Sequence, residues 1–445
     1  MKGLLLCLLF SATSTIPALA QEANEPIVFK TDGIRYQVNA ENNATVSLMP
    51  IDDGYQGDFV LPAQVTDEST GTTYTVTGIG NEAFYRSKCD KITLPATLTS
   101  IAGNAFFYCT MKEFVVDAAS TAYTALDGIL YTKDMSAILS FPNSKDFGNY
   151  QLPETVTSIG DYAFCSVWLT QFDIPEQITS IGEGAFMDTR LRSFEIPATV
   201  KNIGSAVLQN CRSLKTVSFP EGMTVLPDHI LASSYMLEKV DLPSTLTRIG
   251  TYAFSGTFIY SYGSLVQEIV IPDNVTTIES GAFDGCRGLK TVTLNKNLQT
   301  IDLFAFTRCS ALTKLISLNP EPPKCLGMVE EENDVEGAFN EVPASCVLYV
   351  PENSVESYRT AWGSKFTDIR PLETSGIDNI TPNGSDMHVS TADGVLTVSA
   401  ASPVEVFDTT GKKLASRASG SFSTPLTPGV YIVRAGLRSM KVVVR

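Results

Sequence analysis

A six-residue phrase, I-G-x-x-A-F, recurs along the chain and constrains the fold more than any other feature of the sequence. Close copies begin at Ile79, Ile101, Ile159, Ile181 and Ile249, and looser copies begin at Ile203, Val225, Ile278 and Ile301. Most successive copies start 22 to 29 residues apart, although Ile101 and Ile159 are separated by 58 residues. A unit of this length cannot bury its apolar face alone, so the repetition indicates a solenoid of stacked units.

A second phrase, L-x-x-ϕ-x-ϕ followed by proline, lies between the copies of the first, as in LTQFDIP from Leu169 and LRSFEIP from Leu191. Its alternating β-branched and aromatic residues predict a short strand, which the proline ends because it lacks an N–H for the ladder. The fold class is therefore mostly β with short helical or irregular segments. Stacking is expected to bury one phenylalanine per unit as a spine: Phe84, Phe106, Phe164, Phe186, Phe254, Phe283 and Phe306.

The ends of the chain differ in character from the repeats. The first twenty residues place Lys2 before an apolar run that ends on Ala18-Leu19-Ala20, which predicts a cleaved signal peptide and an exported product. After residue 20 the sequence contains no run of about 18 apolar residues, so it predicts no transmembrane helix. We expect a signal peptide at 1–20, a β cap at 21–75, a solenoid at 76–372 with a hairpin insertion near 117–142 and a closing segment at 320–372, and a small C-terminal β-sandwich at 373–445.

These phrases resemble the BspA-like leucine-rich repeat surface proteins of Bacteroidetes over about residues 30 to 372. The hairpin DGILYTKDMSAILSFP and the ending CVLYVPENSVESYRTAWGSKFTDIRPLE from Cys346 carry the resemblance together with the repeats. It implies display at the bacterial surface and binding of a host or matrix protein, with no shared catalytic residues. The C-terminal phrases VEVFDTTGKKL and LTPGVYIV resemble the sorting domain of type IX secretion substrates; a related β-domain kept as a folding cap is the alternative.

Charge and residue types narrow the chemistry. With 48 acidic and 32 basic residues the net charge is −16, which argues against nucleic acid and anionic membranes as partners. The two histidines, His229 and His388, fall in different predicted domains, and the sequence has no C-x-x-C, H-E-x-x-H or G-x-S-x-G. We expect no catalytic residue, cofactor or metal, and we expect His229, at an alanine position of a loose repeat, to be structural.

Eight cysteines follow the signal peptide, and an even number in an exported chain raises the question of disulfides. Four of them lie eight residues after the isoleucine of their unit: Cys109, Cys211, Cys286 and Cys309. Their place in the repeat favours buried free thiols at a packed turn. Cys325 and Cys346 lie outside this pattern and are the candidates for a disulfide.

The strand phrase also predicts a binding surface. One outward residue per strand forms a column on stacking: Thr93, Val115, Asp173, Glu195, Ser218, Asp241, Val270 and Thr293. Asp173, Glu195 and Asp241 make its middle acidic, with Lys215 and Lys239 beside it, and Ser218 completes the candidate site. Solenoids use such columns to bind extended partners. A sheet face that is only solvated is the alternative.

The function expected from this sequence is an exported, non-catalytic adhesion or binding protein of the cell surface that recognises a protein or matrix ligand. A surface glycan-binding protein is the first alternative, and it requires exposed aromatic platforms, for which Tyr85, Phe107, Tyr108 and Trp168 near the repeat turns are candidates. A hydrolase is the second alternative, and it requires a converging acid pair in a cleft.

Overall fold

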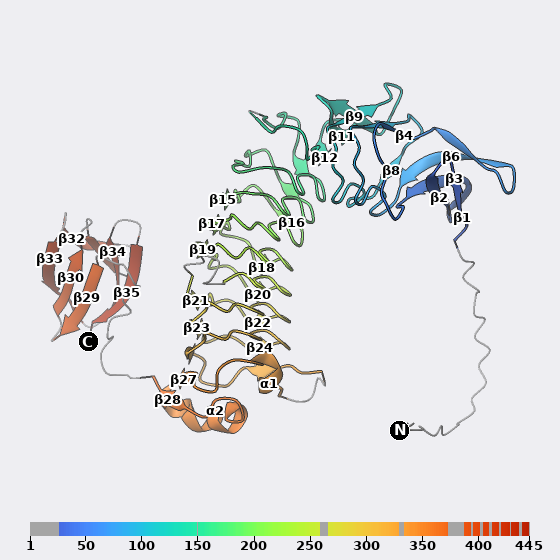
Figure 1. Ribbon diagram of the computed structural model, residues 1–445. Coiled ribbons are helices and arrows are strands. Elements are labelled where there is room, and N and C mark those ends of the chain that lie inside the picture. Colours follow the sequence, from blue (N-terminus) through green and yellow to red (C-terminus); the bar gives the residue numbers. More distant parts are fainter. Residues whose placement is uncertain are drawn as a thin grey trace, which may run out of the picture.

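A computed structural model describes residues 26–148, 150–258, 266–328 and 333–372, together with 387–392, 395–400, 404–408, 412–417, 420–427, 429–435 and 438–444 of the C-terminal part. The expected signal peptide at 1–20 and the start of the C-terminal part at 373–386 lie outside the described residues. The described chain consists mostly of short strands (Figure 1). None of its helices has the length and apolar character needed to span a membrane.

A twisted sheet forms the N-terminal end of the solenoid. Its strand order is β1-β2-β3-β6-β5, with bounds Val28–Thr31, Ile34–Asn39, Asn42–Met49, Thr72–Ile79 and Gln64–Asp67. Strand β6 also pairs in parallel with β8 (Ser100–Ile101), the first short strand that ends at a repeat isoleucine. The N-terminal sheet therefore leads directly into the repeats.

The repeats stack into an arc, whose inner side carries the short strands that end at the repeat isoleucine (Figure 1). After the pair of β6 and β8, these strands form two further ladders of parallel pairs. The first continues from the antiparallel strands β10 (Tyr123–Leu126), β11 (Ile129–Thr132) and β12 (Ala137–Ser140) into β13 (Ser158–Ile159), β14 (Ser180–Ile181) and β16 (Asn202–Ile203). The second contains β18 (Val225–Leu226), β20 (Arg248–Ile249), β22 (Thr277–Ile278), β24 (Thr300–Ile301) and β26 (Lys324–Cys325). Residues 123–140 thus begin a new inner ladder within the 58-residue step, separate from the pairing of β8 with β6.

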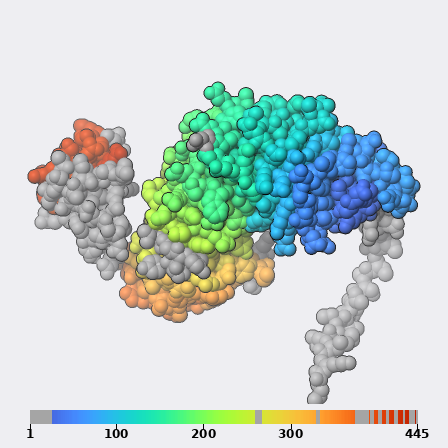
Figure 2. Space-filling view, turned by 45° about the horizontal axis from the view of Figure 1, so that its top comes forward, coloured from blue at the N-terminus to red at the C-terminus, as the bar shows by residue number. Residues whose placement is uncertain are grey.

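The outer side of the arc carries the strands of the second phrase, in three separate parallel ladders. The first contains β4 (Phe59–Val60), β7 (Lys91–Leu94) and β9 (Glu113–Val116), and the second contains β15 (Ser193–Glu195), β17 (Thr216–Ser218) and β19 (Lys239–Asp241). The third contains β21 (Glu268–Val270), β23 (Thr291–Leu294), β25 (Lys314–Ser317), β27 (Val347–Val350) and β28 (Ile369–Pro371). Figure 2 shows the cap, the repeats and the closing segment as successive portions of one curved body.

The phenylalanine spine lies between the inner and outer strands. Six of the seven expected rings are fully buried, and Phe106 is half-buried. The ring of Phe283 stacks on those of Phe254 and Phe306, with centroids 5.1 Å apart in each case and planes within 7°. Leu208 and Leu231 occupy the two spine positions between Phe186 and Phe254, since their backbone bonds continue the same row. The repeat pattern thus predicted the core of the solenoid correctly.

One unit is shifted by one residue from the expected alignment. The ladder pairs Leu226, not Val225, with Ile249, so the repeat isoleucine is replaced by Leu226. His229 consequently takes the place of Tyr252 in the next unit, and the two rings stack with centroids 5.3 Å apart. The expectation that His229 fills an alanine position was wrong by one residue. Burial decides the register, because Leu226 is fully buried whereas Val225 is half-buried.

In the five units from Ile203 to Ile301, a row of hydroxyl and thiol groups runs beside the spine, eight residues after the repeat isoleucine or its replacement. Each member donates to the carbonyl of the spine residue in the preceding unit: Cys211 to Phe186 (3.2 Å), Ser234 to Leu208 (2.7 Å), Thr257 to Leu231 (2.7 Å), Cys286 to Phe254 (3.1 Å) and Cys309 to Phe283 (3.3 Å). Burial raises the pKa of Cys211 and of Cys286 to about 12, so these thiols stay protonated. Cys325 and Cys346 are also buried free thiols, so the candidate disulfide between them is not formed.

The closing segment covers the C-terminal end of the spine. It contains the short helices α1 (Val335–Ala338) and α2 (Val355–Trp362), and the 3-10 turn Glu352–Ser354 directly precedes α2. Phe339 adds one ring to the spine, with its centroid 5.2 Å from that of Phe306. Trp362 packs on Phe339 and donates from its indole nitrogen to the carbonyl of Pro323 at 3.2 Å. The last unit therefore presents no bare apolar ring to solvent.

The C-terminal part forms two small antiparallel sheets. One has the order β29-β30-β33, with bounds Met387–Ala392, Val395–Ala400 and Gly420–Pro425. The other has the order β32-β31-β34-β35, with bounds Lys413–Arg417, Val404–Asp408, Gly429–Ala435 and Arg438–Val444. Both sheets contribute side chains to one small core, which includes Leu396 and Val406. The expected packing as a β-sandwich stays a prediction.

Candidate functional site

The middle outer ladder brings three of the predicted site residues together. Strand register places Glu195 beside Ser218, and Ser218 beside Asp241. The neighbouring Phe194 and Val217 point into the core and are nearly fully buried, so the alternation of the strands turns the three polar residues outward. Glu195 and Asp241 are exposed and Ser218 is half-buried. The column therefore exists over three consecutive units.

Asp173 does not belong to this column. Residues 170–174 form no strand, and the backbone bond that links them to the next unit runs from the amide of Arg192 to the carbonyl of Thr170 at 3.2 Å. The predicted column from Thr93 to Thr293 is also interrupted, because it falls on three separate ladders. Residues 141–148 of the preceding unit contain no strand, so the strand expected around Asp173 has no partner on that side.

The two predicted lysines are held in ion pairs on this surface. Lys239 contacts Asp241 at 2.5 Å, whereas Lys215 contacts Glu238 at 2.6 Å. All four side chains are at least one third exposed, and exposed pairs of this kind stabilise a fold by only about 0–1 kcal/mol. Glu195 and Asp173 make no ion pair within the described chain. The surface is thus of mixed charge, and it includes Glu238, which lies one repeat after Lys215 and which the strand phrase alone did not single out.

Of the four aromatic candidates, Trp168 is the most exposed. Its side chain is 67% exposed, and the guanidinium carbon of Arg190, one unit later, lies 3.7 Å from the ring centroid. Tyr108 is 40% exposed, and its hydroxyl is hydrogen-bonded to Asp188. Tyr85 and Phe107 are half-buried and stack on each other with centroids 6.2 Å apart.

A hollow of about 610 Å³ lies beside Trp168 on the outer side. Its lining includes Trp168, Asp173, Tyr150 and Phe172. The hollow lies between β9 and β15, where the described chain forms no outer strand, and its lining comes from residues 146–148, 150–152 and 168–177. An aromatic face and a carboxylate in one hollow can contact the apolar face and the hydroxyls of a sugar ring.

The described residues offer little for catalysis or metal binding. They include no group of three or more His, Cys, Asp or Glu side chains placed to hold a metal ion. His229 is stacked on Tyr252, and the thiols of Cys211, Cys286 and Cys309 donate to backbone carbonyls. What the arrangement offers is an extended, preformed polar surface.

The chain matches the family model described as "BspA type Leucine rich repeat region" in six copies, over residues 68–125, 139–260 and 256–321, which together exceed half of the sequence. It is similar to a solved leucine-rich repeat protein from Eubacterium ventriosum (21% identity, TM-score 0.42, covering 71% of this chain and 95% of that one). It is also similar to a leucine-rich cell surface protein from Faecalibacterium prausnitzii (22% identity, TM-score 0.32, covering 66% of this chain and 95% of that one). A leucine-rich repeat protein from Bacteroides ovatus is similar as well (18% identity, TM-score 0.35, covering 78% of this chain and 100% of that one). No curated protein matches.

Proposed function

The chain belongs to the BspA-type leucine-rich repeat family, and on that premise we propose that it is an exported, non-catalytic binding protein that recognises a protein or matrix ligand through the outer face of its solenoid. The observation that supports this proposal is the register of β15, β17 and β19, which aligns Glu195, Ser218 and Asp241 on one exposed surface. Repetition of this kind provides a long surface for an extended partner.

Preorganisation is the physical advantage of this surface. The backbone of the column is held by ladder bonds, and the inward residues Phe194 and Val217 are packed in the core. A partner that binds it does not have to order a loop, which removes one of the usual free-energy costs of association. The mixed charge favours a partner whose own charges alternate, because opposite charges must meet across the interface.

Reversing the acidic residues should abolish capture of the protein partner. The variant Asp173→Lys, Glu195→Lys, Asp241→Lys is compared with the parent in a binding screen against extracellular-matrix and mucosal proteins. We expect a hit of the parent to be lost, because like charges then face each other across the interface. Asp173 is included to test whether the surface extends one unit beyond the ladder.

A matched control separates this effect from a change in net charge. The variant Glu41→Lys, Asp52→Lys, Glu68→Lys makes the same change in total charge at three exposed positions of the N-terminal part, outside the outer ladder of the column. It should retain capture. A partner that is still captured after reversal of Asp173, Glu195 and Asp241 would move the site elsewhere on the protein.

Glycan binding is the second candidate function, and the exposed ring of Trp168 beside Asp173 favours it. Sugar rings stack on exposed aromatic faces, and the hollow leaves room beside this one. A glycan array run alongside the protein screen distinguishes the two functions. Hits confined to glycans and lost in Trp168→Ala would make carbohydrate recognition the function of the outer face.

We further propose that the protein reaches the outer surface of a cell of the Bacteroidetes through its signal peptide and its C-terminal part. A chain that ends at Glu373 should then accumulate in the periplasm, whereas the full chain should be reached by protease added to intact cells. The full chain carrying the same detection tag is the control. Equal protease sensitivity of the truncated chain would leave the C-terminal sheets with a folding role only.

A further inference from the structure

The inner ladder is interrupted between β16 and β18, although the unit that contains the interruption has an ordinary length. On the other two edges of the same units the chain remains paired: Phe194 lies beside Val217 in the outer ladder, and the amide of Leu208 donates to the carbonyl of Ile230 at 3.0 Å. Only the inner edge opens. The repeats are therefore stacked normally, but the inner ladder stops at β16 and a separate one begins at β18.

Pro227 accounts for the interruption. In the neighbouring units a glycine follows the repeat isoleucine or leucine, and its amide donates to the preceding strand: Gly182 to Ile159 (2.8 Å), Gly204 to Ile181 (2.8 Å) and Gly250 to Leu226 (3.0 Å). Pro227 occupies this place and has no N–H, so the carbonyl of Ile203 lacks this partner. In the neighbouring units the amide of Lys201 donates to the carbonyl of Thr179, and the amide of Thr247 donates to the carbonyl of Thr224. In the described chain no such bond joins the amide of Thr224 to the carbonyl of Lys201. Both β16 and β18 thus present an unpaired strand edge.

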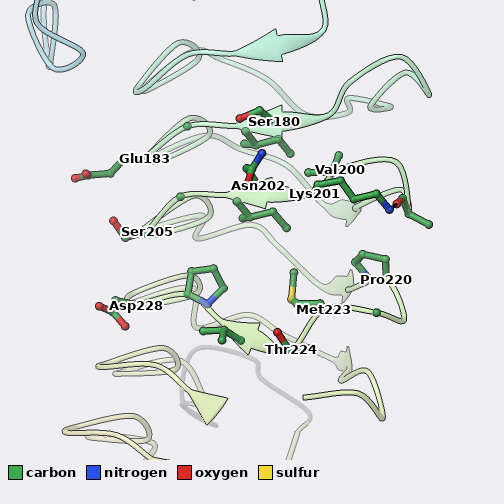
Figure 3. A pocket seen from close by; sticks show the side chains of 18 of the residues that line it. Ser180, Glu183, Val200, Lys201, Asn202, Ser205, Pro220, Met223, Thr224 and Asp228 are labelled. Atoms are coloured by element: carbon green, nitrogen blue, oxygen red, sulfur yellow. Dashed lines mark hydrogen bonds between the residues drawn. The ribbon is translucent and has the colours of Figure 1, made fainter. Parts of the chain in front are cut away.

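A groove of about 780 Å³ lies between these edges, a volume within the usual range of ligand sites. Figure 3 shows Asn202 at β16 and Thr224 at β18, and both residues line the groove. Unpaired backbone donors and acceptors at a sheet edge are a template for a further strand. The groove is therefore suited to an extended polypeptide, which can satisfy several of these groups at once, more than to a compact small molecule.

The two ends of the groove differ in chemistry. At one end Figure 3 shows Glu183 and Asp228, with Ser205 in the unit between them, and at the other it shows Val200, Pro220 and Met223. The carboxylates accept hydrogen bonds, Glu183 from Tyr162 and Asp228 from the amide of Thr251, but within the described chain they make no ion pair.

The two basic side chains of the groove are already engaged. Lys201 donates to the carbonyl of Ala198 at 2.6 Å, and Arg248 pairs with Glu279. The carboxylate end therefore carries negative charge that no described residue of the groove neutralises. A cationic side chain of a ligand would meet it there.

We propose that this groove is a second binding site, which takes an extended segment of a partner protein as an added strand. The segment pairs its backbone with the free edge of β16, sets a Lys or Arg beside Glu183 and Asp228, and places an apolar side chain against Val200 and Met223. Addition of a strand to a sheet edge is an established mode of peptide recognition, in which the backbone provides affinity and the side-chain ends provide specificity. About six residues suffice, because β16 and its flanking residues from Val200 to Ser205 form the edge.

The probe is a dye-labelled six-residue peptide, acetyl-Val-Thr-Val-Lys-Thr-Lys-amide, titrated with the full chain by fluorescence anisotropy. Two matched peptides are titrated beside it: one with Glu in place of both lysines, and one with N-methylated backbone amides that cannot donate. We expect the first peptide to bind and both others to bind at least about tenfold more weakly, since one lacks the charge and the other the backbone bonds. Equal binding of all three, or no binding of the first, overturns the proposal.

Variants of the chain locate the binding. Pro227→Gly restores the missing donor and should let the ladder close, and Asn202→Trp should fill the groove directly, so each should weaken binding of the lysine peptide by at least about tenfold. Pro272→Gly, the same substitution in a unit whose ladder is complete, should not. The reversal of Asp173, Glu195 and Asp241 should also leave peptide binding unchanged, which separates this site from the outer face. Binding that survives both Pro227→Gly and Asn202→Trp places the peptide elsewhere and refutes the groove.

Discussion

Replacing Phe186 with alanine is expected to lower the free energy of unfolding by about 3–5 kcal/mol, because it removes a fully buried ring from the middle of the spine. The ring centroids of Phe164, Phe172 and Phe194 lie 5.3, 5.2 and 4.9 Å from that of Phe186. These rings come from the same unit and from the unit before it, and backbone bonds hold the units at a fixed spacing. The surroundings therefore cannot collapse into the cavity. Urea denaturation followed by circular dichroism measures the change.

Phe304→Ala is the matched control for this prediction. Phe304 lies two residues before the spine residue Phe306, but its ring is 37% exposed. Its removal leaves no closed cavity and should change the stability by a small fraction of the effect at Phe186. Equal losses at the two positions would show that the spine does not carry the stability of the solenoid.

Trp362→Ala is expected to cost a similar amount, about 3–5 kcal/mol, and in addition to make the protein self-associate. Trp362 is fully buried at the end of the stack, where its ring packs on Phe339 and its indole N–H satisfies the carbonyl of Pro323. Truncation uncovers the last ring of the spine, and a solenoid with an uncapped apolar end is prone to associate end to end. Light scattering coupled to size exclusion, together with urea denaturation, measures both effects.

The other tryptophan provides the control. Trp168→Ala removes the same side chain from an exposed position, where the ring contacts Arg190 on one face. It should leave the protein monodisperse and nearly as stable as the parent. A monodisperse, fully stable Trp362→Ala variant would mean that the closing segment does not protect the end of the spine.

The spine was predictable from the sequence because its spacing follows from the repeat. Each unit must bury one large apolar side chain at the same height, so the period of the phrase alone located six fully buried rings and one half-buried ring. Phe339 was not predicted, because the closing segment departs from the period. The unit at Val225 was misaligned by one residue because Val225 and Leu226 are both apolar, and only the pairing with Ile249 distinguishes them.

The candidate site was only partly predictable. Alternation within a strand showed that Glu195, Ser218 and Asp241 share a face, since that follows from the local backbone. Whether a strand has a partner is a non-local property, so the sequence did not reveal that the stretch around Asp173 lies outside every ladder. The pairing of Lys215 with Glu238 and of Lys239 with Asp241 likewise depends on rotamers and on the spacing of neighbouring units.

The sequence by itself determined that this protein is a solenoid of short strands, which side chains form its core, and which residues of each strand point outward. These properties follow from the period of the repeat and from the alternation of the strand, and both are local. The tertiary structure decided where the ladders stop, which surface charges are neutralised, and that Pro227 opens a groove between β16 and β18. A missing donor is visible in the sequence, but its effect depends on the strand across from it, and only the fold places that strand there.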